Sequence, residues 1–367
     1  MKKCLIGAIL SMLLFQSHAL ADTSRSSILI EAETGRILYE HNAHEPLPMA
    51  STTKVMTALV ALENCRLDER VITGKNAFGV PGTSIYLSEG ETLTMENMLY
   101  GLMLSSGNDA AVAIAEHVAG SVDAFCRMMT QRAEELGCEN TVFMTPHGLP
   151  HDIHHTTAYD LSLIAREAMK NDVFRTIVGT QRRQIPWMEH EYDRVLTNKN
   201  RLLSDYEGAT GIKTGYTNKA GRCLVFSAER SGMEVIGVVL NCQNWFDQAA
   251  AIMDEGFEKY EMVTVLGAGE KAGEVEIIGG IKGSMAVCAA ESLRVPMEKG
   301  KIPSVELQLP KFMEAGVRAG DAVGSIQLYD GDELLLSVPL LAMEDAQEAD
   351  FRHHVRRVLD GWQSVSP

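Results

Sequence analysis

Ser51 and Lys54 are the residues whose types and spacing first suggest chemistry. They precede a glycine- and proline-free apolar run, Val55–Leu62, which predicts a buried helix. Ser51 would lie in its first turn, near unpaired backbone N–H groups, with Lys54 on the same face. A buried lysine of lowered pKa can take the proton of a serine nucleophile. The pair therefore predicts a nucleophile and base beside an oxyanion site, although a serine here is more often only a helix cap.

Ser106 and Asn108 form a second candidate group. They lie on a short segment between two apolar, helix-like stretches. In a cleft, the Ser106 hydroxyl could relay protons and the Asn108 amide could hold a substrate amide. An ordinary helix–helix turn capped by Ser and Asn would have the same sequence.

Lys213, Thr214 and Gly215 form the third group. They precede two strand-like runs, 221–228 and 234–240, and so are predicted to lie on a neighbouring strand. Gly215 would leave the strand surface bare for a substrate backbone. Lys213 and Thr214 would offer a charge and a hydroxyl to a terminal carboxylate. Lys-Thr-Gly is a common tripeptide, and on its own it is almost no evidence for a functional site.

Together the three groups resemble the motif set of β-lactamases and penicillin-binding proteins. The order is Ser51-Thr52-Thr53-Lys54, Ser106-Gly107-Asn108 and Lys213-Thr214-Gly215. The surrounding sequence is similar to the D-alanyl-D-alanine carboxypeptidases over roughly residues 24–340, most closely at 48–57, 106–110, 146–149 and 211–215. The short interval between Ser51 and Ser106 leaves no room for a large inserted domain, as in the compact members of that family.

The resemblance implies an acyl-transfer mechanism. Ser51 would attack the carbonyl between the two terminal D-alanines of a peptidoglycan stem peptide, and Lys54 would accept its proton. Ser106 and Lys213 would form a proton path towards the leaving D-alanine, while Asn108 positions the peptide. β-Lactams mimic this substrate and should acylate Ser51.

The resemblance also implies a carboxylate site and an oxyanion hole. Lys213 and Thr214 would bind the terminal carboxylate, and the N–H groups of Ser51 and Tyr216 would hold the oxyanion. Tyr216 departs from some relatives, which carry histidine there. Some relatives also place an arginine before Lys-Thr-Gly. The nearby cations here are Lys199 and Arg201, and the sequence does not choose between them.

Three rival functions share these motifs. A D,D-endopeptidase of the same fold would cleave cross-linked peptides. A class A β-lactamase would need a deacylating glutamate in an E-x-x-x-N context, which Glu134, Glu135 and Glu139 do not provide. A catalytically silent peptidoglycan- or penicillin-binding module is disfavoured because all the key side chains are intact. We therefore expect a carboxypeptidase.

The expected fold class is α/β, in the α+β sense. A β-lactamase/transpeptidase-like catalytic domain at 22–262 would have an antiparallel sheet flanked by helices, beginning with a hairpin within 24–42. Short valine-, isoleucine- and leucine-rich runs broken by glycines then predict a small β-sandwich domain at 263–343. That domain holds no cluster of catalytic residue types.

The two ends of the chain suggest the location. Residues 1–21 have a basic start, a short apolar core and a final Ala-Leu-Ala, which predict a secretory signal peptide. Residues 344–367 predict a basic amphipathic helix suited to an anionic membrane surface, or else to packing on the β-domain. We expect an exported cell-envelope protein, peripheral on the outer face of the cytoplasmic membrane or secreted. Its net charge of −16 argues against nucleic acid as a partner.

The spacings of the cysteines and histidines match no metal-binding motif. Six cysteines follow residue 21, so disulfides are open, although Cys223 and Cys242 lie in apolar runs typical of buried thiols. The histidines at 147, 151, 154 and 155 match no standard site. No metal and no cofactor are expected.

Overall fold

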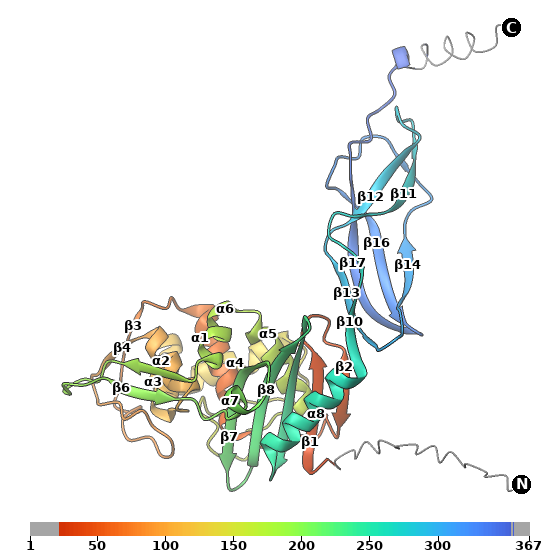
Figure 1. Cartoon of the computed structure of the whole chain (residues 1–367). Coiled ribbons are helices and arrows are strands. Elements are labelled where there is room, and N and C mark those ends of the chain that lie inside the picture. The colour runs from red at the N-terminus through yellow and green to blue at the C-terminus, as the bar shows by residue number, and fades with distance from the viewer. Residues whose placement is uncertain (1–21, 354, 356–367) are drawn as a thin grey trace, which may run out of the picture.

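The fold was analysed in a computed structural model, which describes residues 22–353 and residue 355 (Figure 1). The predicted signal peptide and most of the predicted tail helix lie outside the described residues. No helix in the described part of the chain is both long enough and apolar enough to cross a membrane.

A five-stranded sheet forms the centre of the catalytic domain. Its order is β2-β1-β9-β8-β7, and every neighbouring pair is antiparallel. The bounds are β1 Ser24–Glu31, β2 Ile37–His41, β7 Ala209–Thr217, β8 Gly221–Arg230 and β9 Met233–Cys242. The predicted hairpin within 24–42 and the strands around Lys213 are confirmed.

The sheet is buried on both faces, because successive side chains point to opposite sides. Ile28 and Val225 join a large core shared with most of the helices, whereas Leu29 and Phe226 join a smaller core under α8 (Trp245–Lys259). Figure 1 shows α8 crossing the sheet on the side away from α1 (Lys54–Asn64) and α5 (Ala158–Met169). This layered arrangement confirms the expected fold class.

The larger helical layer carries two of the three motif groups. A 3-10 turn, Ala50–Thr53, leads into α1 (Lys54–Asn64), and α2 (Met95–Met103) is followed by α3 (Asn108–Ala119). The remaining helices are α4 Val122–Glu135, α5 Ala158–Met169, α6 Asp172–Gly179 and α7 Leu202–Asp205. Two small hairpins pair β3 Arg70–Ile72 with β4 Thr92–Thr94, and β5 Arg182–Ile185 with β6 Arg194–Thr197.

The C-terminal domain is all β, as expected. A six-stranded sheet of order β14-β16-β17-β12-β11-β15 shares one core with the β10-β13 pair. The strands are β10 Tyr260–Leu266, β11 Lys271–Ile278, β12 Ser284–Ala289, β13 Leu293–Glu298, β14 Ser304–Gln308, β15 Phe312–Glu314, β16 Ala322–Asp330 and β17 Glu333–Ala342.

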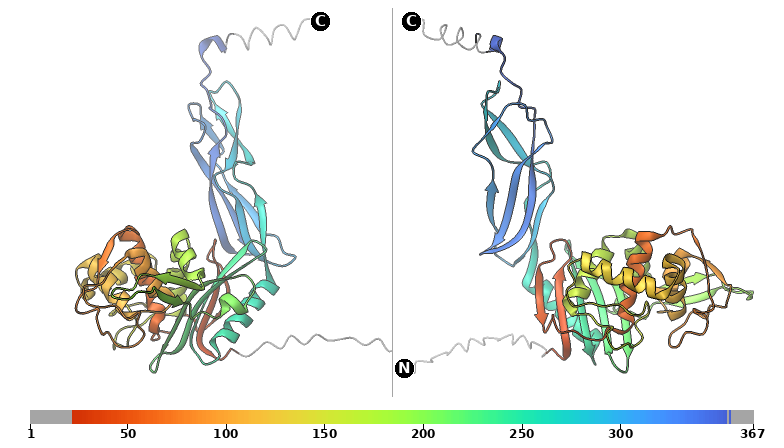
Figure 2. Two further views of the ribbon diagram at one scale, coloured as in Figure 1. Left: turned by 60° about the vertical axis from the view of Figure 1, so that its left-hand side comes forward. Right: turned by 180° about the vertical axis from the view of Figure 1, so that it is seen from behind.

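Arg36, in the β1–β2 turn, fixes the junction between the domains. Its guanidinium is nearly buried, donates to the Pro296 carbonyl at 2.6 Å and pairs with Asp330 at 2.5 Å. Figure 2 shows that the β-domain projects from the catalytic domain as an elongated arm, with the end of the described chain at its far tip.

Candidate active site

Ser51 lies in the 3-10 turn that enters α1, close to the predicted position. The turn is held by the Ala50 carbonyl, which accepts a hydrogen bond from Thr53 Oγ1 at 2.8 Å. Ala50 has a φ of +50°, and Gly148 packs so closely that a Cβ there would lie 1.8 Å from the Ala50 oxygen. Only glycine fits at 148, so this contact fixes the backbone that presents Ser51.

Lys54 joins Ser51 to the second motif group. Its Nζ lies 3.0 Å from Ser51 Oγ, 2.7 Å from Asn108 Oδ1 and 2.8 Å from the His147 carbonyl oxygen. The side chain has no exposed surface. Three acceptors therefore hold the amine within hydrogen-bond reach of the serine hydroxyl, as a general base requires.

Burial lowers the pKa of Lys54 well below its usual value, and the positive charges of Lys213 and Lys199 lower it further, while Asp109 opposes them. A lowered pKa increases the fraction of neutral amine, the form that can accept a proton. The two motif residues Ser51 and Lys54 thus have both the geometry and the electrostatics of a nucleophile–base pair.

Asn108 is the first residue of α3 and is fixed on both sides of its amide. Oδ1 accepts from Lys54, and Nδ2 donates to the Pro81 carbonyl at 2.7 Å. The next residue, Asp109, is buried and accepts hydrogen bonds from Ser84 Oγ and from the N–H groups of Ile85 and Leu87. Asp109 therefore fastens the 81–87 loop to the helix that carries Asn108.

Ser106 lies beside this loop with a φ of +62°. Its backbone carbonyl accepts from Thr83 Oγ1 at 2.5 Å. Its side-chain oxygen is buried and has no hydrogen-bond partner among the described residues. The hydroxyl is thus free to accept and donate a proton, although the expected path from Ser106 to Lys213 is not a formed hydrogen-bond chain in this structure.

Strand β7 brings the third motif group against Ser51. A Cβ on Gly215 would lie 2.9 Å from the Ser51 nitrogen and 3.0 Å from the Thr52 nitrogen, so the bare strand faces the nucleophile turn. Lys213 is buried, donates to the Thr214 carbonyl at 2.9 Å, and has its pKa lowered to about 7 by burial and by the charge of Lys199. Tyr216 is 60% exposed at the end of the group.

Lys199, rather than Arg201, is the additional cation near the site. Lys199 lies close enough to lower the pKa of both Lys54 and Lys213. Arg201 pairs instead with Asp205 at 2.8 Å and stacks on Phe246. The sequence did not distinguish them, because the order of residues gives no direction for either side chain.

Several site residues were not singled out from the sequence. The Pro81 and His147 carbonyls, the buried carboxylate of Asp109 and the hydroxyl of Thr83 position the motif side chains. Asp109 and His147 lie in segments that carry the resemblance, but no role is assigned to either from the sequence. Backbone carbonyls have no residue-type signal. The sequence does contain a signal for Asp109, because it is an acidic residue at the start of an otherwise apolar helix.

The histidine loop has a structural part in the site. His154 is buried with a pKa lowered to about 4, mainly by desolvation; its Nδ1 accepts from the Met144 N–H, and its Nε2 bonds Thr53 Oγ1 at 2.9 Å. His147 is similarly buried, with a pKa lowered to about 3, and contributes its carbonyl to Lys54. Two of the four histidines thus support the Ser51 turn.

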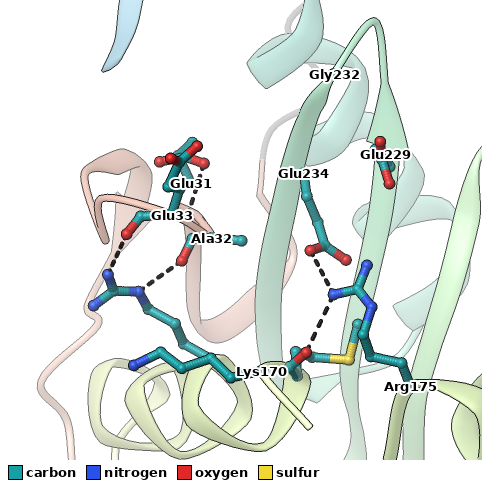
Figure 3. Close-up of a pocket in the computed structure, with 10 residues that line it drawn as sticks. Glu31, Ala32, Glu33, Lys170, Arg175, Glu229, Gly232 and Glu234 are labelled. Carbon is teal, nitrogen blue, oxygen red and sulfur yellow. Dashed lines mark hydrogen bonds and ion pairs between the residues drawn. The ribbon is translucent and has the colours of Figure 1, made fainter. Parts of the chain in front are cut away.

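A separate pocket of about 250 Å³ lies between α5, α6 and the ends of β1, β8 and β9 (Figure 3). Arg175 pairs there with Glu234 at 2.8 Å, and Arg166 donates to the carbonyls of Ala32 and Glu33. None of the motif residues lines it. Both arginines already bond other protein groups, and these bonds connect the helices to the sheet.

The chain is similar to known proteins over nearly its whole length. Residues 15–244 match the family described as D-alanyl-D-alanine carboxypeptidase, and residues 260–348 match the C-terminal domain of penicillin-binding protein 5. The D-alanyl-D-alanine carboxypeptidase DacF of Bacillus subtilis is 32% identical over 360 residues, covering 95% of this chain and 92% of the relative. DacD of Escherichia coli is 30% identical over 362 residues, covering 90% of each.

A solved structure has the same architecture. The crystal structure of penicillin-binding protein 5 from Haemophilus influenzae superposes with a TM-score of 0.76 at 26% identity, covering 89% of this chain and 98% of that one. The similarity extends across both the catalytic and the β-domain.

Proposed function

The chain belongs to the D-alanyl-D-alanine carboxypeptidase family, and on that premise we propose how its own residues perform the reaction. It is a serine-type peptidase that acts on peptidoglycan and binds β-lactams. The observation that supports the assignment of residues is the 3.0 Å contact between Lys54 Nζ and Ser51 Oγ, with the lysine buried.

In the acylation step, Ser51 Oγ attacks the carbonyl carbon between the two terminal D-alanines, and Lys54 takes the hydroxyl proton. The oxyanion that forms is held by the backbone N–H groups of Ser51 and Tyr216, a type of stabilisation that usually supplies a large share of acyl-transfer catalysis. Asn108, fixed by Lys54 and Pro81, orients the peptide amide.

In the departure step, the C–N bond breaks and the amine of the terminal D-alanine takes, through Ser106, the proton that Lys54 received from Ser51. Its unpaired buried hydroxyl supports this role, because it can bond the leaving nitrogen without breaking an existing bond. Lys213 and Thr214 bind the terminal carboxylate, and Lys199 adds positive potential. Water then hydrolyses the Ser51 ester and frees the shortened stem peptide.

For the location, we propose that residues 1–21 direct export, that 22–262 and 263–343 are the catalytic and β-domains, and that 344–367 contact the membrane. The similarity to penicillin-binding proteins and D-alanyl-D-alanine carboxypeptidases, whose substrate is in the cell wall, supports a location in the cell envelope. The tail begins at the tip of the β-arm, far from the catalytic domain (Figure 2), so the arm would act as a spacer.

The test is the product formed from two purified substrates. The proposal predicts release of free D-alanine from a pentapeptide stem and little cleavage of a cross-linked muropeptide dimer. Preferential cleavage of the dimer would instead assign a D,D-endopeptidase. Loss of either activity in Ser51→Ala ties it to this site, and absence of both in the wild-type protein would favour a silent binding module.

A further inference from the structure

Cys65, Glu69 and His117 converge at the end of the catalytic domain's helical layer that is opposite Ser51. Cys65 caps α1, Glu69 lies in the turn before β3, and His117 lies in the last turn of α3. Their ligand-type atoms lie within 4.8 Å of one another, and His117 Nε2 is 3.1 Å from Glu69 Oε2. Thiolate, imidazole and carboxylate are all zinc ligands.

We propose that these three side chains form a zinc site, with water as the fourth ligand. A tetrahedral ion with ligand distances of about 2.0–2.3 Å fits between atoms so spaced after small side-chain adjustments. The mixed sulfur and nitrogen donors favour zinc over calcium or magnesium, which take oxygen ligands.

The surroundings already orient two of the ligands. Glu69 Oε1 accepts the Arg66 N–H at 2.9 Å, which leaves Oε2 directed towards His117. Such outer contacts hold a ligand in place and typically affect metal affinity. The site is partly exposed, with 24% of the His117 side chain and 35% of the Glu69 side chain accessible, so an ion and its water can enter.

Zinc binding would release the thiol proton of Cys65 to solvent and leave zinc bound by thiolate, imidazole and carboxylate. Without the ion, burial and the Glu69 carboxylate raise the pKa of Cys65, so the thiol is protonated at neutral pH. The cluster could also be held together without a metal, by a hydrogen-bonded Cys65 thiol and a His117–Glu69 pair. The test must distinguish this metal-free arrangement from a zinc site.

The site would join the far ends of the two helices that supply the active site. Helix α1 starts with Lys54 and α3 starts with Asn108, whose side chains meet at 2.7 Å. Helices of 11 and 12 residues are about 16–18 Å long, so the zinc lies too far from Ser51 to take part in its chemistry. Its role is to clamp the helix pair.

The test titrates the reduced, metal-free full-length mature chain with zinc against a chromophoric chelator, and with cobalt as a spectroscopic probe. We compare the wild type with Cys65→Ser and His117→Gln. The matched control is Cys288→Ser, which removes a partly buried thiol from the β-domain. Acylation by penicillin reports that each variant remains folded.

The proposal predicts one zinc per chain in the wild type and in Cys288→Ser, with affinity at least about tenfold weaker in the two ligand variants. Cobalt should give a thiolate charge-transfer band that Cys65→Ser abolishes, while penicillin acylation is unchanged. Absence of saturable uptake by the wild type would overturn the proposal. Equal affinity in all four proteins would also overturn it, because the ion would then lie elsewhere, for example on the histidine loop.

Discussion

Lys54 Nζ lies 2.7 Å from Asn108 Oδ1, which places the base of the first motif in direct contact with the amide of the second. The two residues begin two packed helices, α1 and α3, and are 54 positions apart. One buried amine thus organises the serine, the asparagine and the His147 carbonyl. Acylation should therefore be more sensitive than the fold to any change in the charge or position of this amine.

Replacing Lys54 by methionine should remove the base while keeping most of the side-chain volume. We expect the rate of acylation by a fluorescent penicillin to fall by roughly 100-fold or more, since general base catalysis contributes on that scale. Lys271→Met, at an exposed position in the β-domain, is the matched control and should react like the wild type. A rate within a few-fold of wild type in Lys54→Met would mean that another group takes the Ser51 proton.

Asn108→Asp tests the charge next to Lys54 at nearly constant shape. A carboxylate 2.7 Å from the amine favours its protonated form, so the pKa of Lys54 should rise. The neutral base then appears only at higher pH, and the acid limb of the acylation profile should shift upwards. Asn171→Asp, which exchanges one good helix cap for another at α6, should leave the profile in place. An unshifted acid limb in Asn108→Asp would mean that Lys54 is not the group whose titration sets that limb.

Lys213 should set an alkaline limb for substrates with a terminal carboxylate. Its pKa is lowered to about 7, mainly by burial, so the side chain is charged below that pH and loses its charge above it. The value of kcat/KM for a D-alanyl-D-alanine peptide should therefore fall as pH rises through about 7, because kcat/KM reports the free enzyme. Lys213→Arg, charged at all these pH values, should lose that limb, whereas Lys271→Arg should retain it. A limb common to both variants would point to a different group.

Gly215→Ala tests the close approach of β7 to the nucleophile turn. The new Cβ would lie 2.9 Å from the Ser51 nitrogen, a backbone atom that cannot swing away. We expect a shifted Ser51 and acylation slowed by roughly tenfold to 100-fold, because small misplacements of reacting groups are costly. Gly283→Ala has open space around its Cβ and no positive φ, and should behave like the wild type. Equal rates in the two variants would show that β7 can move without consequence.

The tail can be removed without cutting into the β-domain. Residues up to 349 still bond the arm, since the Ala346 N–H donates to the Val317 carbonyl and the Ala349 N–H donates to the Gly279 carbonyl. Deleting 351–367 should therefore release the protein from membranes in sedimentation while D-alanine release is retained. Continued sedimentation with membranes would argue for packing of the tail on the protein or for another anchor.

Much of the fold could be predicted because local patterns agree with the tertiary structure. The run after Lys54 forms a helix, the Ser106 group joins two helices, and the strands around Lys213 pair as expected. The sequence does not decide whether the six cysteines after residue 21 form disulfides. In the structure all six are free thiols, and Cys223 and Cys242 are buried.

The rest depends on contacts that sequence order does not encode. Ala50 has a positive φ, and its carbonyl is bonded by Thr53 of the same turn and packs against Gly148 from another part of the chain. Lys199 is favoured over Arg201 because Arg201 pairs with Asp205 and stacks on Phe246, contacts that the order of residues does not reveal. Cys65, Glu69 and His117 match no metal motif, because the third ligand arrives from a separate helix.

The central claim, that Ser51 is the nucleophile of a penicillin-binding serine peptidase, is tested most directly by mass spectrometry after incubation with benzylpenicillin. The wild-type mature protein should gain one covalent adduct on the peptide that carries Ser51, and Ser51→Ala should gain none. The absence of an adduct on the wild-type protein, with the penicillin left intact, or an adduct that persists in Ser51→Ala, would contradict the account.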